Sequence, residues 1–200
     1  PSAPREIGRI DTPGFAYGVA VRGDHAVVAD FTAGVRVIDV SRPRRPREVA
    51  SLASLRRAVD VAIDGNFAFV ADAQDGVAVI DLEDPRSPDE VALIATAEGT
   101  TSLDFSVLVD HQRLLIAHDW LWVADISDPT SPAVMTSEIL PSVASDVAVF
   151  DDLTLVGSRS SGRFVLQEEL CAAPSDGELT VAARGGADEE PAGESIRLSD

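Results

Sequence analysis

The sequence predicts an all-β protein, a β-propeller-like array of about four antiparallel blades with four strands each, which together form an incomplete propeller. The main observation is an internal repeat, whose copies lie roughly 42 residues apart. Each copy contains short runs rich in valine and isoleucine that are separated by turn residues. The first three copies also share a Pro-x-x-Pro turn. Four short strands in each repeat of about forty residues are typical of a propeller blade.

The first two copies match position by position, with 18–46 corresponding to 60–88. Within each copy the runs are separated by turn signals such as Gly23-Asp24 and Gly65-Asn66. The fourth run follows the proline turn, and proline cannot donate a ladder hydrogen bond, so we expect this run at the outer edge of its sheet. The strands expected in the first copy are 19–21, 26–29, 35–38 and 48–52.

The later copies are less regular. The third occupies 104–132, and the fourth begins at Asp146, extends to Glu168 and lacks the proline turn. After about residue 171 the chain becomes rich in Ala, Gly, Ser and acidic residues, which is typical of a linker or of the start of a further segment. We therefore expect blades within 1–171, in units near 7–52, 53–94, 95–136 and 137–171, followed by an acidic low-complexity segment at 172–200.

Several of these short stretches carry a family resemblance. The "VAD" that ends the second run, the third runs "GVRVIDV" and "GVAVIDL" and the turns "SRPRRP" and "EDPRSP" resemble LVIVD repeats, over about Ile7 to Glu168. The resemblance implies a β-propeller of a secreted or surface-attached protein and implies no catalytic residues. The expected location, extracellular or at the cell surface, rests on this resemblance, because the sequence contains no basic-then-apolar leader.

Propellers of this family typically contain more than four blades. We therefore favour an incomplete propeller, either a fragment of a longer chain or one completed by another copy, over a closed four-bladed ring. The expected partners are accordingly an unidentified protein or surface ligand and further blades of the same propeller.

Composition excludes several functional classes. The chain has 34 acidic and 16 basic residues, all of the latter arginine, for a net charge of −18. Binding to nucleic acid or to anionic lipid needs positive surface, so we expect neither. No apolar run reaches the ~20 residues of a membrane-spanning helix. The single cysteine, Cys171, excludes an internal disulfide and a cysteine-based zinc site.

The candidate binding residues follow from blade geometry. The first strand of a blade lies nearest the central channel, and its start lies on the same face as the end of the second strand. This places Asp60, Asp104 and Asp146 at one mouth of the channel, with Asp72 and His118 at the ends of second strands on that face. Clustered carboxylates attract cations, and Ca²⁺ is the metal that several oxygen ligands would suit. The alternative, which we favour, is that each Asp caps its own turn.

Other polar residues have simpler explanations. Asp39, Asp81 and Asp125 end third strands and are expected to cap Asx-type turns. The first proline turn is rich in arginine and could dock an acidic partner or a phosphate, but we favour a solvated turn. We expect His25 and His111 to be turn residues, and Trp120 and Trp122 to pack between blades. The arginines of the first proline turn are Arg42, Arg44, Arg45 and Arg47.

Together these features favour a non-catalytic binding or scaffold propeller. The alternative is a metal-assisted hydrolase or lactonase-like enzyme that uses the channel-mouth carboxylates, with His118 beside Asp119 as an acid–base pair. Fold alone does not separate the two, because propellers host both roles.

Overall fold

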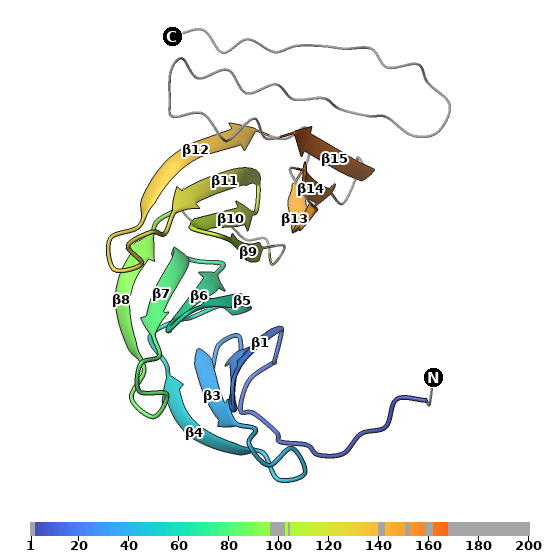
Figure 1. Cartoon of the computed structure of the whole chain (residues 1–200), viewed down its shortest axis with the longest axis vertical. Coiled ribbons are helices and arrows are strands. Elements are labelled where there is room, and N and C mark those ends of the chain that lie inside the picture. Colours follow the sequence, from blue (N-terminus) through green and yellow to red (C-terminus); the bar gives the residue numbers. More distant parts are fainter. Residues whose placement is uncertain are drawn as a thin grey trace, which may run out of the picture.

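The computed structural model describes residues 3–96, 103, 105–139, 143–150, 153–158 and 162–167. All regular elements in these ranges are β-strands, and they form successive sheets around an open arc (Figure 1). The predicted all-β incomplete propeller is therefore confirmed, and the closed four-bladed ring is not adopted. The described residues contain no helix that could cross a bilayer. The predicted segment 172–200 lies outside the described residues.

The strands of each sheet follow one another in sequence order and pair antiparallel. Blade 1 consists of β1 (Gly18–Arg22), β2 (His25–Ala29), β3 (Val35–Asp39) and β4 (Arg47–Leu52). Blade 2 consists of β5 (Ala58–Asp64), β6 (Phe67–Asp72), β7 (Gly76–Asp81) and β8 (Asp89–Ile94). Blade 3 consists of β9 (Ser106–Asp110), β10 (Arg113–Ala117), β11 (Trp120–Asp125) and β12 (Ala133–Ile139).

Blade 4 differs from the others. Its described strands are β13 (Ala144–Phe150), β14 (Leu153–Ser158) and β15 (Gly162–Gln167), in that order, so β15 is the edge strand of the described sheet. In blades 1 to 3 the proline turn leads from the third strand into the fourth. The sequence after β15 lacks this turn.

The first strands of the blades are the innermost. Contacts join β1 to β5, β5 to β9 and β9 to β13, so these strands lie side by side along the inside of the arc (Figure 1). In blade 2, Asp60 pairs with Ala71, and Ala58 pairs with Asp72. The start of the first strand and the end of the second therefore lie at the same end of the blade, as predicted.

The hairpin between the first and second strands is tight in three blades. Gly23, Gly65 and His111 occupy its turn with φ of 55°, 52° and 56°. Glycine adopts this left-handed region without steric cost, and a few non-glycine residues tolerate it. The prediction that His111 is a turn residue is confirmed, whereas the same prediction for His25 is wrong, because His25 follows the turn as the first residue of β2.

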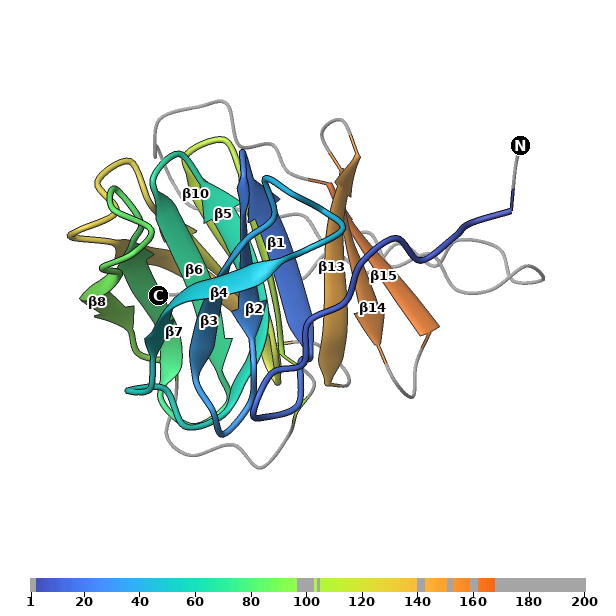
Figure 2. The same ribbon diagram turned by 90° about the horizontal axis from the view of Figure 1, so that it is seen from below.

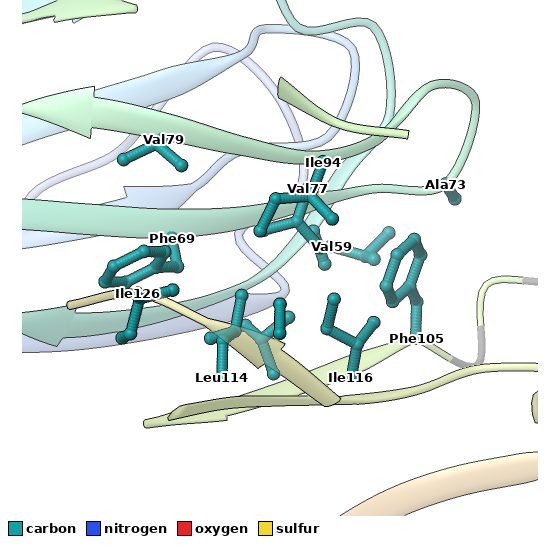
Figure 3. Packing of buried hydrophobic residues seen from close by; sticks show 13 residues of the cluster. Val59, Phe69, Ala73, Val77, Val79, Ile94, Phe105, Leu114, Ile116 and Ile126 are labelled. Atoms are coloured by element: carbon teal, nitrogen blue, oxygen red, sulfur yellow. The ribbon is translucent and has the colours of Figure 1, made fainter. Parts of the chain in front are cut away.

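The core lies between blades rather than within one. The contact between blades 2 and 3 joins Val59, Phe69 and Val77 to Leu114 and Ile116, all buried (Figure 3). Central strands have a neighbouring blade on each face, so they are continuous apolar runs rather than alternating ones. Burial of a side chain such as Phe69 contributes roughly 2 kcal/mol or more.

Aromatic residues of β11 add to this contact. The rings of Trp120 and Trp122 stack with centroids 5.6 Å apart and an interplanar angle of 13°. Trp122 packs against the cluster between blades 2 and 3. The predicted inter-blade packing is confirmed for Trp122, while Trp120 at the start of the strand keeps 37% of its surface exposed.

The segment that precedes β1 crosses blade 1 on the side away from blade 2 (Figure 2). Ile10 packs there against Ala26, Val28 and Ile38. This segment covers the second and third strands of blade 1 but leaves β1 open, where Val19 and Val21 are 64% and 63% exposed.

Candidate functional site

One position of the inner strands joins the blades. We call it the inner position, and it is the first-strand residue that pairs with the residue directly before the polar residue at the end of the second strand. In blade 2 it is Asp60, which pairs with Ala71. The Asp60 Oδ1 accepts a hydrogen bond from the N–H of Val61 at 2.9 Å, and Oδ2 accepts one from the N–H of Val107 at 3.0 Å. Asp60 thus binds its own strand and the first strand of blade 3.

The register gives the inner positions of the last two blades. Ser106 pairs with Ala117, and Asp146 pairs with Gly157, as Asp60 pairs with Ala71. The Asp146 Oδ1 accepts hydrogen bonds from the N–H of Val147 at 2.9 Å and from Ser106 Oγ at 3.2 Å. Asp104, the third predicted carboxylate, lies outside the described residues.

Blade 1 has Gly18 at the inner position, opposite Ala29. A Cβ atom added to Gly18 would lie 2.7 Å from the Cα and 2.9 Å from the Oδ1 of Asp60. Only glycine fits this close approach of β1 to β5. The inner positions therefore alternate along the arc as Gly18, Asp60, Ser106 and Asp146.

The carboxylates that end second strands have a different task. Asp72 is fully buried, and its Oδ2 accepts a hydrogen bond from the N–H of Arg56 at 2.7 Å, while its Oδ1 accepts one from the N–H of Gln74 at 2.8 Å. Asp30 of blade 1 is equally buried and accepts from Thr12 Oγ1 at 2.6 Å and from the N–H of Gly14 at 3.0 Å. Each of these residues anchors the linker that enters its blade.

His118 takes the corresponding place in blade 3 and is 3% exposed. Its ring lies 4.8 Å from the ring of Phe105, and its Nδ1 lies 3.6 Å from Asp119 Oδ2. That separation is longer than a hydrogen bond. The backbone of His118 also bonds across to blade 4, because its carbonyl accepts from the N–H of Ala144 at 2.8 Å.

The four predicted site residues that the structure describes therefore lie at one end of the blades but make separate contacts. Asp60 and Asp146 bind inner strands, Asp72 binds a linker, and His118 packs on an aromatic ring. Among the residues that the structure describes, no group of three His, Cys, Asp or Glu side chains is placed to hold a metal ion. The calcium site and the acid–base pair remain predictions.

The carboxylates that end third strands cap turns, as predicted. The Oδ1 atoms of Asp39, Asp81 and Asp125 accept hydrogen bonds from the backbone N–H two residues on, at 2.9, 2.7 and 2.8 Å. A hydrogen bond from the Ser41 side chain lowers the pKa of Asp39. The backbone hydrogen bond from Ser127 lowers the pKa of Asp125 in the same way.

The proline turns differ at the residue directly before their first proline. In blades 2 and 3, Asp84 and Asp128 accept hydrogen bonds from the N–H of Arg86 and Thr130, both at 3.0 Å, and so cap the turn. Blade 1 has Arg42 at that position and retains only the backbone bond from the N–H of Arg45 to the carbonyl of Arg42, at 2.7 Å. Blade 1 thus lacks a cap of the kind that stabilises turns by about 1 kcal/mol.

The arginines of this turn line a hollow of about 310 Å³. Its lining residues are Asp39, Ser41, Arg42, Arg45 and Arg47. Three arginines and one aspartate line it, so the lining is mainly basic in a chain with a net charge of −18. We call it the arginine hollow.

Sequence reasoning missed a second arginine feature. The Arg36 side chain is 14% exposed within β3, with Nε 3.5 Å from Asp30 Oδ2. Its terminal nitrogens donate to Glu48 Oε1 at 3.3 Å and to the carbonyl of Ala33 at 3.0 Å. The sequence feature that could have indicated it is an arginine inside the apolar run "VRVID", at the position where the second copy has Ala78.

Comparison with solved structures supports the blade-array fold. The computationally designed Ika4 protein is similar with a TM-score of 0.64 and 10% identity, over 82% of this chain and 98% of that chain. The designed Ika8 protein gives 0.58 and 10%, over 75% and 45%. A functionally unknown protein from Desulfotomaculum acetoxidans DSM 771 gives 0.68 and 14%, over 79% and 56%. The chain thus spans about half the length of the last two proteins.

No curated protein matches the sequence. The LVIVD repeat matches it at three places, 13–53, 55–96 and 114–138, which together make up more than half of the chain. These matches coincide with blades 1 and 2 and with most of blade 3. The chain therefore belongs to the LVIVD-repeat family.

Proposed function

We propose that this protein is a non-catalytic binding scaffold that acts outside the cell or at its surface, and that the arginine hollow of blade 1 receives an anionic group of its partner. The location is supported by the family, whose repeat the sequence matches in blades 1 and 2 and in most of blade 3. The observation that carries the binding role is the replacement of a turn-capping aspartate by Arg42.

Arg42 at this position lowers the local stability of the turn and makes no structural contact with the described residues that compensates for the lost cap. Asp84 and Asp128 show what the turn needs, since each caps it through a backbone N–H. Arg42 supplies no such cap and instead lines the hollow with Arg45 and Arg47. Binding residues often break a local rule that the rest of a repeat obeys. The gain expected here is a cluster of forked donors that match carboxylate or phosphate oxygens.

The charge of the rest of the protein makes this cluster selective. The acidic body repels anions in general, so binding depends on close contact with the guanidinium groups rather than on a long-range field. We therefore expect a ligand with several anionic groups close together, and binding that weakens as salt screens these contacts.

The experiment compares blade 1 with its own repeats. Calorimetric titration at low ionic strength uses two probes, a hexaglutamate peptide and inorganic pyrophosphate, which separate carboxylate from phosphate recognition. The double variant Arg42→Asp/Arg45→Ser gives blade 1 the residues that blade 2 has as Asp84 and Ser87. We expect it to fold at least as well as the wild type and to weaken binding of the recognised probe by about tenfold or more.

The matched control is Arg86→Ser, which removes one arginine from the turn of blade 2, where Asp84 caps the chain. It should leave binding within about twofold of the wild type. If neither probe binds, or if the double variant binds as well as the control, the arginine hollow is not a binding site.

A further inference from the structure

Val19 shows that one side of blade 1 is uncovered at its first strand. We call the side of a blade that faces the preceding blade its front face and the opposite side its back face. Val61, Val107 and Val147 follow the inner positions of blades 2 to 4 and are 6%, 5% and 6% exposed. Val19 holds the same place in blade 1 and is 64% exposed. Blade 1 thus retains the apolar front face of a blade that has a predecessor.

None of the described residues covers the back face of blade 4 at its first strand. Ala62 and Leu108, in the first strands of blades 2 and 3, pack against the clusters that join them to the next blade. Ala148 holds the corresponding place in blade 4 and is exposed. Two residues on, Phe150 is 65% exposed, whereas blades 2 and 3 have Asp64 and Asp110 at that position.

The backbone amides of the front faces show what a preceding blade supplies. The N–H groups of Val61 and Val147 bond to the aspartate at the inner position of their own blade. Blade 3 has Ser106 there, and the N–H of Val107 bonds instead to Asp60 of the preceding blade. Blade 1 has Gly18 at its inner position, so Val19 corresponds to Val107, and its N–H is placed to bond to an aspartate of a blade in front of it.

The segment before β1 repeats the end of a blade. Residues 4–10, "PREIGRI", match "PREVASL" at 46–52, which contains β4. The linkers that follow also match, because Gly14 N–H bonds to Asp30 as Arg56 N–H bonds to Asp72. Ile10 packs on the front face of blade 1, as the equivalent Leu52 packs on the cluster that joins blades 1 and 2. Residues 5–10 therefore have the sequence and the place of an outer strand of a preceding blade.

We propose that a second copy of this chain supplies that blade. The back face of blade 4 of each copy covers the front face of blade 1 of the other, and residues 5–10 pair with β15 as the fourth strand of the partner's blade. The Oδ2 atom of Asp146, which accepts no hydrogen bond from the described residues, then accepts from the N–H of the other copy's Val19, as Asp60 Oδ2 accepts from the N–H of Val107. Two such contacts, related by a two-fold axis, close a ring of eight blades.

Blade 4 fits this place better than an arbitrary partner does. The inner positions alternate between residues without a carboxylate and residues with one, and blade 4, the last described blade, has Asp146. A blade that carries an aspartate at this position is what Val19 requires. The contact also repeats the established packing of one blade on the next, and eight blades lie within the range that propellers adopt. Closure by a two-fold axis leaves neither face exposed.

The test is the mass of the full chain in solution, measured by sedimentation equilibrium at physiological salt. We expect twice the chain mass of 21.1 kDa. Val19→Asp and Phe150→Asp each place a charge on one of the two faces, and each should weaken the dimer by roughly tenfold or more. Val134→Asp is the matched control, because Val134 is 45% exposed on the outer strand β12, and it should change the dissociation constant by less than about twofold.

A third variant, Asp146→Asn, keeps an oxygen for Val147 but presents an amide group to Val19, so it should weaken the dimer while the monomer melts as before. All variants affect exposed groups, and circular dichroism verifies that each is folded. The proposal is overturned by a monomeric wild type, which would leave the faces to another segment of the same chain or to a different protein. A mass above that of a dimer, or a dimer sensitive to Val19→Asp but not to Phe150→Asp, also overturns it.

Discussion

The Asp60 carboxylate joins blade 2 to blade 3, because its Oδ2 accepts a hydrogen bond from the backbone N–H of Val107 at 3.0 Å while its Oδ1 holds the N–H of Val61. Val107 is a buried residue of the neighbouring inner strand. A side chain of one blade thus accepts a hydrogen bond from the backbone of the next blade. This bond is the only described one in which an inner-position carboxylate caps an amide of the following blade.

We expect Asp60→Ala to lower the free energy of unfolding by about 2 kcal/mol, because it leaves two backbone donors without their acceptor. Asp60→Asn should cost less, since its single carbonyl oxygen can still serve one of them. The measurement is urea denaturation followed by circular dichroism. Asp64→Ala, on the same strand but exposed, should stay within about 0.5 kcal/mol of the wild type. Equal losses in the two alanine variants would contradict the bridging role.

Gly18→Ala should also destabilise the protein, for a steric reason. The added Cβ would lie 2.7 Å from the Asp60 Cα, and both atoms belong to strands that cannot move independently. We expect a loss of about 1–3 kcal/mol in the same denaturation assay.

The matched control is Gly157→Ala in blade 4, where the nearest atom to the new Cβ is the Asp146 Cβ at 3.6 Å. This is an ordinary contact, and alanine also restricts the unfolded chain, so stability should be unchanged or slightly higher. A tolerated Gly18→Ala would show that β1 and β5 can separate at little cost.

The blades were predictable from the repeat, and so were the inner positions Asp60 and Asp146, but the inner position of blade 3 was misassigned. The sequence repeat makes Asp104 the blade 3 equivalent of Asp60, whereas the strand register shows that the equivalent residue is Ser106. Counting back from the hairpin would have found Ser106, since seven positions separate both Asp60 from Phe67 and Ser106 from Arg113. The uncovered face at Val19 had no such signal. All four blades have valine there, and only the arrangement of the sheets shows which one lacks a neighbour.

The calcium site that the sequence leaves open has a direct test. Each carboxylate oxygen of Asp60 already accepts a hydrogen bond from a backbone donor, so Ca²⁺ at 2.3–2.6 Å would have to share these oxygens with the two donors. We therefore expect melting temperatures in millimolar calcium and in EDTA to agree within about one degree. A rise with calcium of several degrees that disappears in Asp60→Ala/Asp104→Ala would establish a metal site.

Stability should pass through a maximum in mildly acidic solution. The chain carries 34 acidic and 16 basic residues and has an isoelectric point near 4.3, so lowering the pH from 7 relieves repulsion within the compact state. An opposing effect begins near the ordinary pKa of aspartate. Hydrogen bonds from the Thr130 side chain and then its backbone lower the pKa of Asp128, and the bond from Ser127 lowers that of Asp125.

The sign of this second effect follows from linkage. A carboxyl whose pKa is lower in the folded state stabilises the fold above its unfolded pKa of about 3.9, and this contribution is lost as the pH falls through the folded value. We expect stability to rise from pH 7 to about 4.5 and to fall below about pH 4. Denaturation measured across this range tests the prediction. Asp128→Asn keeps an acceptor for Thr130 but cannot ionise, so its free energy of unfolding should decrease less below pH 4 than that of the wild type. An identical decrease in the two proteins would show that the turn carboxylates do not cause the loss of stability in acid.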